Sequence, residues 1–128
     1  MIDEKEREIC IGENRFYLSD NNMLYITIVG DVDKETAIAC KNATDKLYEM
    51  IEGKVHILID INKAGKQSSE ARKIGVEKFD DRKVGKVALF GLHPVARVLA
   101  SFVMNVSKNK NMRFFKTTEE AIAWIREE

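Results

Sequence analysis

Two nearly continuous apolar runs, each followed by a helix start, constrain the fold of this chain more than any other feature. They are Val55–Ile61 (VHILIDI) and Val84–Gly91 (VGKVALFG). Strands that are apolar at successive positions are buried on both faces, as in parallel sheets covered by helices. Ser68 or Ser69 can cap a helix after the first run, and Pro94 suits the first turn of a helix after the second. The chain is therefore expected to have an α/β fold.

Other segments extend this alternation toward both ends of the chain. Residues 15–18 and 23–29 are rich in aromatic and β-branched types and are separated by turn residues, which predicts an opening β-hairpin. The further elements are expected in this order: a helix over about 34–51 capped by Asp33 and ended by Gly53, a helix from Ser68 or Ser69 to before Asp80, a helix from Pro94 to about Ser107, a strand over 112–115, and a last helix capped by Thr117. The predicted architecture is one domain over residues 14–128, with a mixed, mostly parallel sheet and about four helices, after a charged leader at residues 1–13.

Charge and apolar content exclude several classes of protein. The chain has 128 residues with 21 Lys+Arg and 21 Asp+Glu, so it lacks the positive field that favours nucleic acid. No apolar stretch reaches the roughly 18–20 residues of a spanning helix, and the opening MIDEKEREI has no signal-peptide core. We therefore expect a cytoplasmic protein, with peripheral contact at a membrane as the alternative. Cys10 and Cys40 form no CxxC pair and are expected to be reduced packing residues.

The segment 62–69 (NKAGKQSS) is expected to be a loop between a buried strand and a helix, where α/β proteins place ligand sites. It lacks the spacing of a phosphate-binding P-loop, because Asp60 stands where that motif has its first Gly and Gln67 where it has Ser or Thr. Ser68 and Ser69 are interpreted first as helix caps, with phosphorylation as the alternative. Asp60 is expected to hold backbone N–H groups of the loop, with a role as an acid as the alternative.

The segment Phe90–Pro94 (FGLHP) is a second candidate site, because a helix N-terminus can hold an anion or a carboxylate. His93 could sense pH or shuttle a proton there. The other histidine, His56, falls inside the buried strand, so the two do not have metal-ligand spacing. No Cys/His nucleophile pair is visible either, because Cys40 falls on the core side of its helix. We expect no metal, no cofactor and no enzymatic activity.

The helix after Pro94 is a third candidate, because its apolar residues cover an arc of roughly 240°, more than packing on one sheet face requires. One interpretation is burial against neighbouring helices. The other is an outer side, including Ala96, Ala100 and Met104, that contacts a lipid, a membrane surface or a second copy of the chain. Basic residues flank the helix and suit either interpretation: Arg97, Lys108, Lys110 and Arg113.

Three segments, in this order and spacing, resemble the STAS superfamily: VHILIDINKAGKQSSEARKIG, GKVALFGLHPVARVLASFVMN and MRFFKTTEEAIAWI. The resemblance covers about residues 15–127. Within the superfamily it is to stand-alone domains similar to the sporulation anti-anti-sigma factor, which are related to CRAL-TRIO-type lipid-binding domains. It implies a mixed sheet packed with helices, no catalysis, and a role in protein–protein signalling or in binding small apolar or anionic ligands.

The resemblance also implies a phosphorylation site, because anti-sigma antagonists carry an Asp-Ser-Ser-Gly-type helix start that a partner kinase phosphorylates. Asp60 matches the strand end, and Ser68 and Ser69 match the helix start. Gln67 replaces the acidic residue of that pattern, and Glu70 replaces the Gly. A carboxylate beside a phosphoserine is unfavourable, so these departures weaken the phosphorylation interpretation.

Two functions follow as hypotheses. The first is a non-enzymatic binding module for a small apolar, amphipathic or anionic ligand, or for a membrane surface, at the helix over residues 92–107. Its polar end would comprise Asp60, Gly91, His93 and Arg97, and its apolar wall Leu92, Val95, Ala96, Leu99, Val103 and Met104. The alternative is a regulator that binds a signalling protein and is switched by phosphorylation at Ser68 or Ser69. A homodimer would cover the same apolar helix.

Overall fold

Six strands form one mixed sheet in the computed structural model, which describes residues 7–19 and 21–127. The strands follow one another across the sheet in sequence order. β2 is antiparallel to both of its neighbours, β1 and β3, and the strands from β3 to β6 are parallel to one another. The strands are β1 (Glu8–Ile11), β2 (Asn14–Leu18), β3 (Met23–Val32), β4 (Val55–Gln67), β5 (Val84–Phe90) and β6 (Met112–Phe115). The expected α/β class, with an antiparallel hairpin and a mostly parallel sheet, is confirmed.

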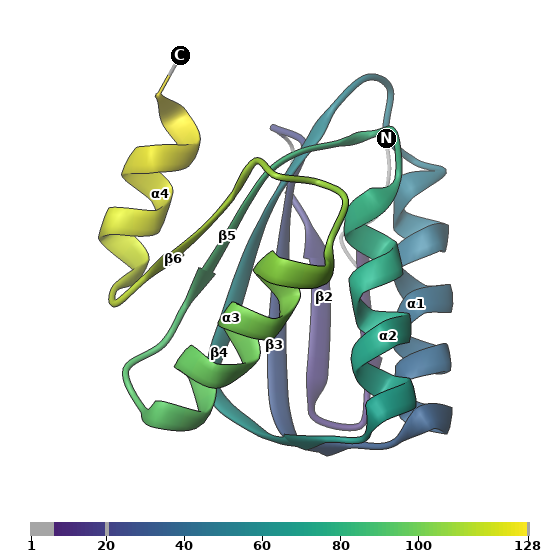
Figure 1. Ribbon diagram of the computed structural model, residues 1–128. Coiled ribbons are helices and arrows are strands. Elements are labelled where there is room, and N and C mark those ends of the chain that lie inside the picture. Colours follow the sequence, from purple (N-terminus) through teal and green to yellow (C-terminus); the bar gives the residue numbers. More distant parts are fainter. Residues whose placement is uncertain (1–6, 20, 128) are drawn as a thin grey trace.

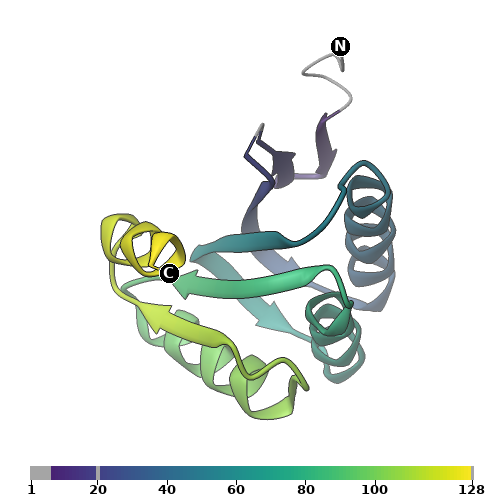
Figure 2. The same cartoon turned by 90° about the horizontal axis from the view of Figure 1, so that it is seen from above.

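Helices cover both faces of the sheet. They are α1 (Lys34–Tyr48), α2 (Ser69–Glu77), α3 (Pro94–Val106) and α4 (Thr118–Arg126), and a short 3-10 turn, η2 (Lys78–Asp80), follows α2. Figure 1 shows α1 and α2 side by side against the sheet, with α3 next to them. Figure 2 shows α4 on the other side of the sheet, beside β5 and β6. The central strands therefore have helices on both faces.

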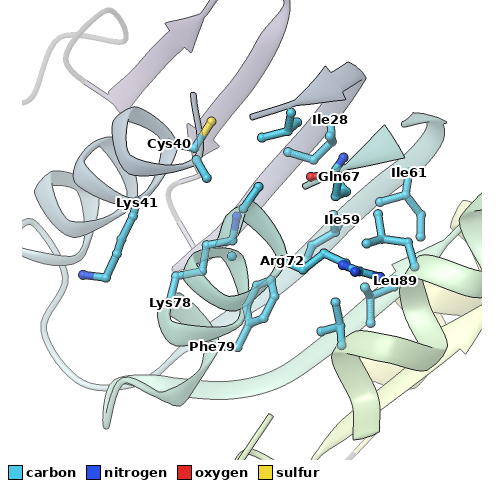
Figure 3. A pocket seen from close by; sticks show the side chains of 16 residues that line it. Ile28, Cys40, Lys41, Ile59, Ile61, Gln67, Arg72, Lys78, Phe79 and Leu89 are labelled. Carbon is cyan, nitrogen blue, oxygen red and sulfur yellow. The ribbon is translucent and has the colours of Figure 1, made fainter. Parts of the chain in front are cut away.

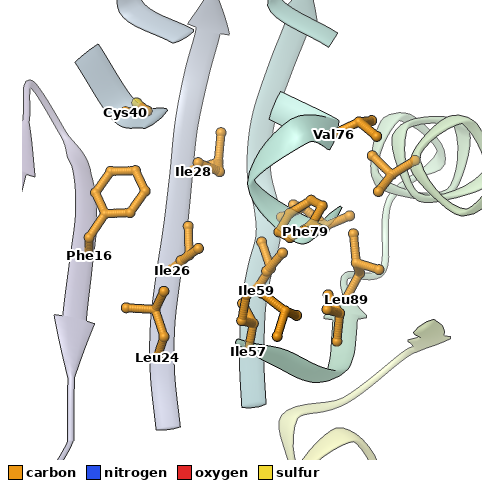
Figure 4. Packing of buried hydrophobic residues seen from close by; sticks show 14 of the residues in the cluster. Phe16, Leu24, Ile26, Ile28, Cys40, Ile57, Ile59, Val76, Phe79 and Leu89 are labelled. Carbon is orange, nitrogen blue, oxygen red and sulfur yellow. The ribbon is translucent and has the colours of Figure 1, made fainter. Parts of the chain in front are cut away.

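Alternating side chains of the parallel strands build two separate cores. Ile57 and Ile59 of β4 point into the larger core, beneath α1, α2 and α3 (Figure 4), and Ile61 belongs to the same core. Leu58, between them in sequence, packs against Trp124 of α4 in the smaller core. All four side chains are buried, as expected for a strand with helices on both sides. Cys40 is also buried in the larger core, whereas Cys10 is exposed, so the expectation that both cysteines are packing residues is wrong for Cys10.

Three helix caps predicted from the sequence are confirmed. The hydroxyl or carboxylate of each cap accepts a hydrogen bond from a backbone N–H in the first turn, as N-cap residues do. The pairs are Asp33 with Thr36 at 2.8 Å, Ser68 with Ala71 at 3.0 Å and Thr117 with Glu120 at 3.2 Å. Helix α1 ends at Tyr48 instead of continuing to residue 51. The chain turns there through hydrogen bonds from the N–H groups of Met50 and Ile51 to the carbonyls of Leu47 and Tyr48.

Part of the segment expected to be a leader is a strand. Residues 8–11 form β1, which pairs with β2 in the register Ile9 with Phe16 and Ile11 with Asn14. Ile9 and Ile11 pack against the larger core, and Glu8 contacts Arg15 across the pair. The strand is short and its apolar residues alternate with polar ones, so its sequence alone looks like a charged tail. Residues 1–6 of the expected leader lie outside the described residues.

The expected loop after the buried strand is also a strand. β4 continues to Gln67, and its second half pairs with β3, with Lys63 opposite Val29 and Ala64 opposite Gly30. This register follows an irregularity in the ladder between Thr27 and Val29. The turn chemistry of residues 62–67 therefore marks a bend in a long strand, and Ser68 alone joins β4 to α2.

Candidate functional site around helix α3

Helix α3 packs on the sheet through small residues. Ala96 and Ala100 are almost fully buried, and Val103 is buried beside them. The approach is close, since a Cβ atom built on Gly91 would lie 2.7 Å from the Cβ of Ala96. The expectation that Ala96, Ala100 and Met104 form an outer side is therefore wrong: the two alanines are innermost and Met104 is half-buried. Small side chains face the sheet because they let the helix backbone approach it.

The exposed apolar side of α3 lies on different residues. Leu92 is 73% exposed and Val98 is 67% exposed, which is unusual for large apolar side chains. Val95 and Val106 are also exposed. We call these four residues the outer stripe: Leu92, Val95, Val98 and Val106. Leu99 and Phe102 are half-buried between the outer stripe and the core.

Basic residues are close to the outer stripe in the sequence and line two hollows beside it. The chain has eight Lys and Arg and no Asp or Glu from Arg82 to Thr118, a segment that includes all of α3. A hollow at the start of α3 is lined by Arg97 and Lys116 as well as Leu92. A second hollow, between α3 and the end of β4, is lined by Lys66 and Arg72 together with two members of the outer stripe, Val95 and Val98. Neither hollow has a carboxylate in its lining.

A chain of hydrogen bonds fixes the start of α3. The carboxylate of Asp60 accepts from the backbone N–H of Asn62 at 2.9 Å and from its side-chain amide at 3.0 Å. The side-chain oxygen of Asn62 accepts from the N–H of Leu92 at 3.1 Å. Asp60 thus holds a neighbouring backbone N–H group, as expected. It does not lie with Gly91, His93 and Arg97, because it lines a different hollow on the α4 side of the sheet, with Leu58 and Phe90.

The remaining predicted residues fall into three places. Gly91, Leu92, His93 and Arg97 line the hollow at the start of α3. His93 is the N-cap residue of α3, but its side chain makes no cap hydrogen bond, and Pro94 occupies the first turn as expected. Leu99 and Val103 line a partly open cavity between the sheet and helices α1, α2 and α3. Val95 borders the second hollow, so the predicted wall is divided between surface and interior.

Four polar residues of that cavity were not predicted as site residues: Lys41, Gln67, Arg72 and Lys78. Long basic side chains at helical spacing are typical of a solvated helix face, which is why sequence reasoning passed over Arg72 and Lys78. The sequence holds one indication that Lys78 is buried: it stands beside the apolar Phe79 at the end of the amphipathic pattern of α2. Lys78 is 7% exposed.

Comparison with known proteins places the chain in a family. The family described as "Domain of unknown function (DUF7793)" matches residues 16–128. The chain belongs to this family. No curated protein matches the DUF7793 chain significantly.

Solved structures share the fold of the DUF7793 domain. A protein of the DUF3478 family with a SpoIIAA-like fold, from Shewanella loihica PV-4, has a TM-score of 0.65 and 17% identity, over 87% of this chain and 90% of that chain. The anti-sigma factor antagonist SpoIIAA in its unphosphorylated form has a TM-score of 0.61 and 15% identity, over 88% of this chain and 97% of that chain. At these identities the likeness shows the fold alone. The DUF7793 domain therefore has the SpoIIAA-like fold that the STAS resemblance implied, whereas the relation to CRAL-TRIO-type domains stays a prediction.

The two serines of the DUF7793 domain differ in accessibility. Ser68 is half-buried and its hydroxyl caps α2, whereas Ser69 is exposed at the first position of the helix. Within residues 7–19 and 21–127, no three His, Cys, Asp or Glu side chains cluster as metal ligands would. None of the helices in the same residues is long and apolar enough to cross a membrane.

Proposed function

We propose that the DUF7793 domain is a non-catalytic binding module that docks on an anionic lipid surface through the outer stripe of α3. The observation that carries this proposal is that the four apolar residues of the outer stripe fall within a segment that has eight basic residues and no acidic ones. The net charge of the whole chain is zero, so this segment is more basic than the rest of the chain. A helix with an apolar side and a basic surround suits the interface of a membrane, where it lies in the plane of the headgroups.

Two favourable contributions add together in this arrangement. Removing an exposed Val or Leu side chain from water contributes about 1.5 kcal/mol or more. Each Lys or Arg close to an anionic surface contributes about 1 kcal/mol, and salt screens that contribution. The four apolar side chains of the outer stripe together with Arg97, Lys66 and Lys116 can therefore hold the domain at the surface reversibly, with no spanning helix.

Substituting Val98 by glutamate tests the apolar contribution. The V98E variant is expected to bind vesicles rich in phosphatidylglycerol at least tenfold more weakly than the original protein, because it loses an apolar contact and gains a repelled charge. Vesicle co-flotation measures the bound fraction. The matched control is Ile38→Glu, since Ile38 is an exposed apolar residue of α1, 41% exposed, outside this face. Equal binding by the two variants would contradict the proposed docking face.

Substituting Arg97 by glutamine tests the electrostatic contribution in the same assay. Binding to phosphatidylglycerol vesicles is expected to fall about fivefold, the equivalent of roughly 1 kcal/mol. Binding to pure phosphatidylcholine vesicles should be weak for every variant. If the protein instead forms a dimer that V98E converts to monomer, and binds no vesicle, a second copy covers the outer stripe and the lipid proposal falls.

The second candidate function is a regulator that binds a signalling protein and is switched at Ser69. Two observations favour it: the fold is shared with SpoIIAA, which is described as an anti-sigma factor antagonist, and Ser69 is exposed at the start of α2. A phosphate at a helix N-terminus is favoured by the helix dipole, whereas the neighbouring Glu70 opposes it. Ser68 suits this role less well because its hydroxyl already accepts the cap hydrogen bond.

Phosphopeptide mass spectrometry on protein isolated from its own cells tests this second candidate. Modification is expected at Ser69 and not at Ser68. A Ser69→Asp variant should also change which proteins co-purify, with Ser101→Asp as a control, because Ser101 is an exposed serine of α3. If neither serine is modified and co-purification is unchanged, the regulator hypothesis is wrong.

A further inference from the structure

The partly open cavity between the sheet and helices α1, α2 and α3 (Figure 3) has a volume of about 70 Å³. One water needs roughly 10–15 Å³ on this measure, so the cavity has room for a molecule of a few heavy atoms. Its walls are mostly apolar, with Ile59, Leu89 and Leu99 among them. Its lining includes no Asp and no Glu.

Three nitrogen donors in this cavity lack partners within the described part of the chain. Gln67 Nε2 and Arg72 Nε are buried and make no hydrogen bond there, and the guanidinium carbon of Arg72 lies over the ring of Phe102, 4.8 Å from its centre. The ammonium of Lys78 has no hydrogen bond or ion pair to a described residue, and it lies over the rings of Phe79 and Phe16, 5.3 Å and 5.7 Å from their centres.

A third cation at the cavity, Lys41, differs from these donors. Its ammonium forms an ion pair with Asp45 at 3.0 Å. In Figure 3 the Lys41 side chain extends away from the cavity, while the Lys78 and Arg72 side chains extend into it.

Buried donors without acceptors destabilise a protein, and buried cations without an anion do so more strongly. A water molecule in the cavity could accept a hydrogen bond from Gln67 or Arg72, but it would neutralise no charge. An anion with a short apolar part would satisfy the donors, balance the charge and fill the apolar remainder.

We propose that this cavity binds a small monocarboxylate, with Lys78 and Arg72 as counter-charges and Gln67 as a neutral donor to the carboxylate. The cavity adjoins the docking face at the second hollow, but its counter-charges and donor lie outside the outer stripe, so this proposal does not depend on the lipid proposal. The volume of the cavity limits the ligand to a short chain, and the mostly apolar walls favour a ligand with a single negative charge. The second hollow shares Gln67, Arg72 and Leu99 with the cavity, and this gives a route from the surface.

Isothermal titration with acetate, butyrate, hexanoate and decanoate tests the proposal, with butan-1-ol and butylamine as probes of equal length and different charge. Butyrate or hexanoate is expected to bind saturably and at least tenfold more tightly than either probe. Lys78→Met should weaken butyrate binding at least tenfold. Lys73→Met is the matched control, since Lys73 is an exposed lysine of α2, and it should leave binding unchanged.

Arg72→Gln is the second variant and should weaken binding as well, so that misfolding of one variant does not remove the test. Amide NMR spectra establish that each variant is folded. Equal binding of butan-1-ol and butyrate would show an apolar cavity without an anion site and would overturn the proposal. Absence of saturable binding by any carboxylate, or equal weakening by the Lys73 and Lys78 substitutions, would overturn it too.

Discussion

Replacing Lys78 by methionine is expected to raise the free energy of unfolding of the ligand-free domain by about 1–3 kcal/mol. Lys78 is buried, and burial lowers the pKa of its ammonium, because nothing in the described residues compensates for the lost hydration except two aromatic faces and the thiol of Cys40. Methionine keeps the length and apolar stem of the side chain and removes the charge. The stabilisation can be measured by chemical denaturation near neutral pH.

The pH dependence of this effect has a definite sign. A lysine whose pKa is lowered in the folded state binds fewer protons there than in the unfolded chain, so stability rises with pH until the ordinary pKa of about 10.4 is reached. The free energy of unfolding of the original protein should therefore increase with pH between the lowered pKa of Lys78 and about 10.4, by up to roughly 1.4 kcal/mol per pH unit, and the range from about pH 7 to pH 8.5 is the one to measure. The Lys78→Met variant should lack this increase.

The range from pH 7 to pH 8.5 avoids the titration of the other groups whose pKa is shifted by burial. Burial lowers the pKa of His56, so its contribution to the pH dependence lies below about 6.5. Burial raises the pKa of both Cys40 and Tyr48, and these residues lower stability only as the pH rises above about 8.5 and about 10. Lys73→Met is the control and should change neither the stability nor its slope. A destabilised Lys78→Met variant would mean that the contacts with Phe16 and Phe79 outweigh the desolvation of the ammonium.

The parts of the fold that sequence predicted well are those set by local chemistry. The apolar runs of β4 and β5 and the caps at Asp33, Ser68 and Thr117 each depend on a few neighbouring residues. The failures depend on pairing between distant segments. β1 and the second half of β4 are strands because β2 and β3 lie beside them, and neither has a strong apolar pattern of its own.

The sequence interpretation of α3 assigned its residues to the wrong sides of the helix. Apolar residues cover so much of α3 that periodicity cannot distinguish the inner side from the outer, and the small Ala96 looks as suited to the surface as Val98. Lys78 was missed for a related reason, since the length of a lysine side chain allows it to reach either water or the core. Tertiary packing decides both cases.

The close approach of α3 to the sheet leads to the second large prediction. Replacing Ala96 by leucine is expected to lower the free energy of unfolding by about 1–3 kcal/mol, because the added atoms have no space. Ala96 is 0% exposed and its Cβ lies against Gly91, where even one added carbon would meet it at 2.7 Å. The helix would have to move away from the sheet, so its amide hydrogens should also exchange faster with solvent than those of the original protein. Chemical denaturation and hydrogen exchange measure the two effects.

Ser101→Leu is the matched control for this substitution, because it adds a leucine to the exposed side of the same helix. It should leave stability within about 0.5 kcal/mol of the original protein, as surface substitutions usually do. If Ala96→Leu is tolerated as well as Ser101→Leu, α3 does not rest closely on the sheet in solution. The outer stripe is defined by that packing, because Val95 and Val98 are exposed only while Ala96 and Ala100 face the sheet. The stability of Ala96→Leu therefore also tests which side of α3 is available to a lipid surface.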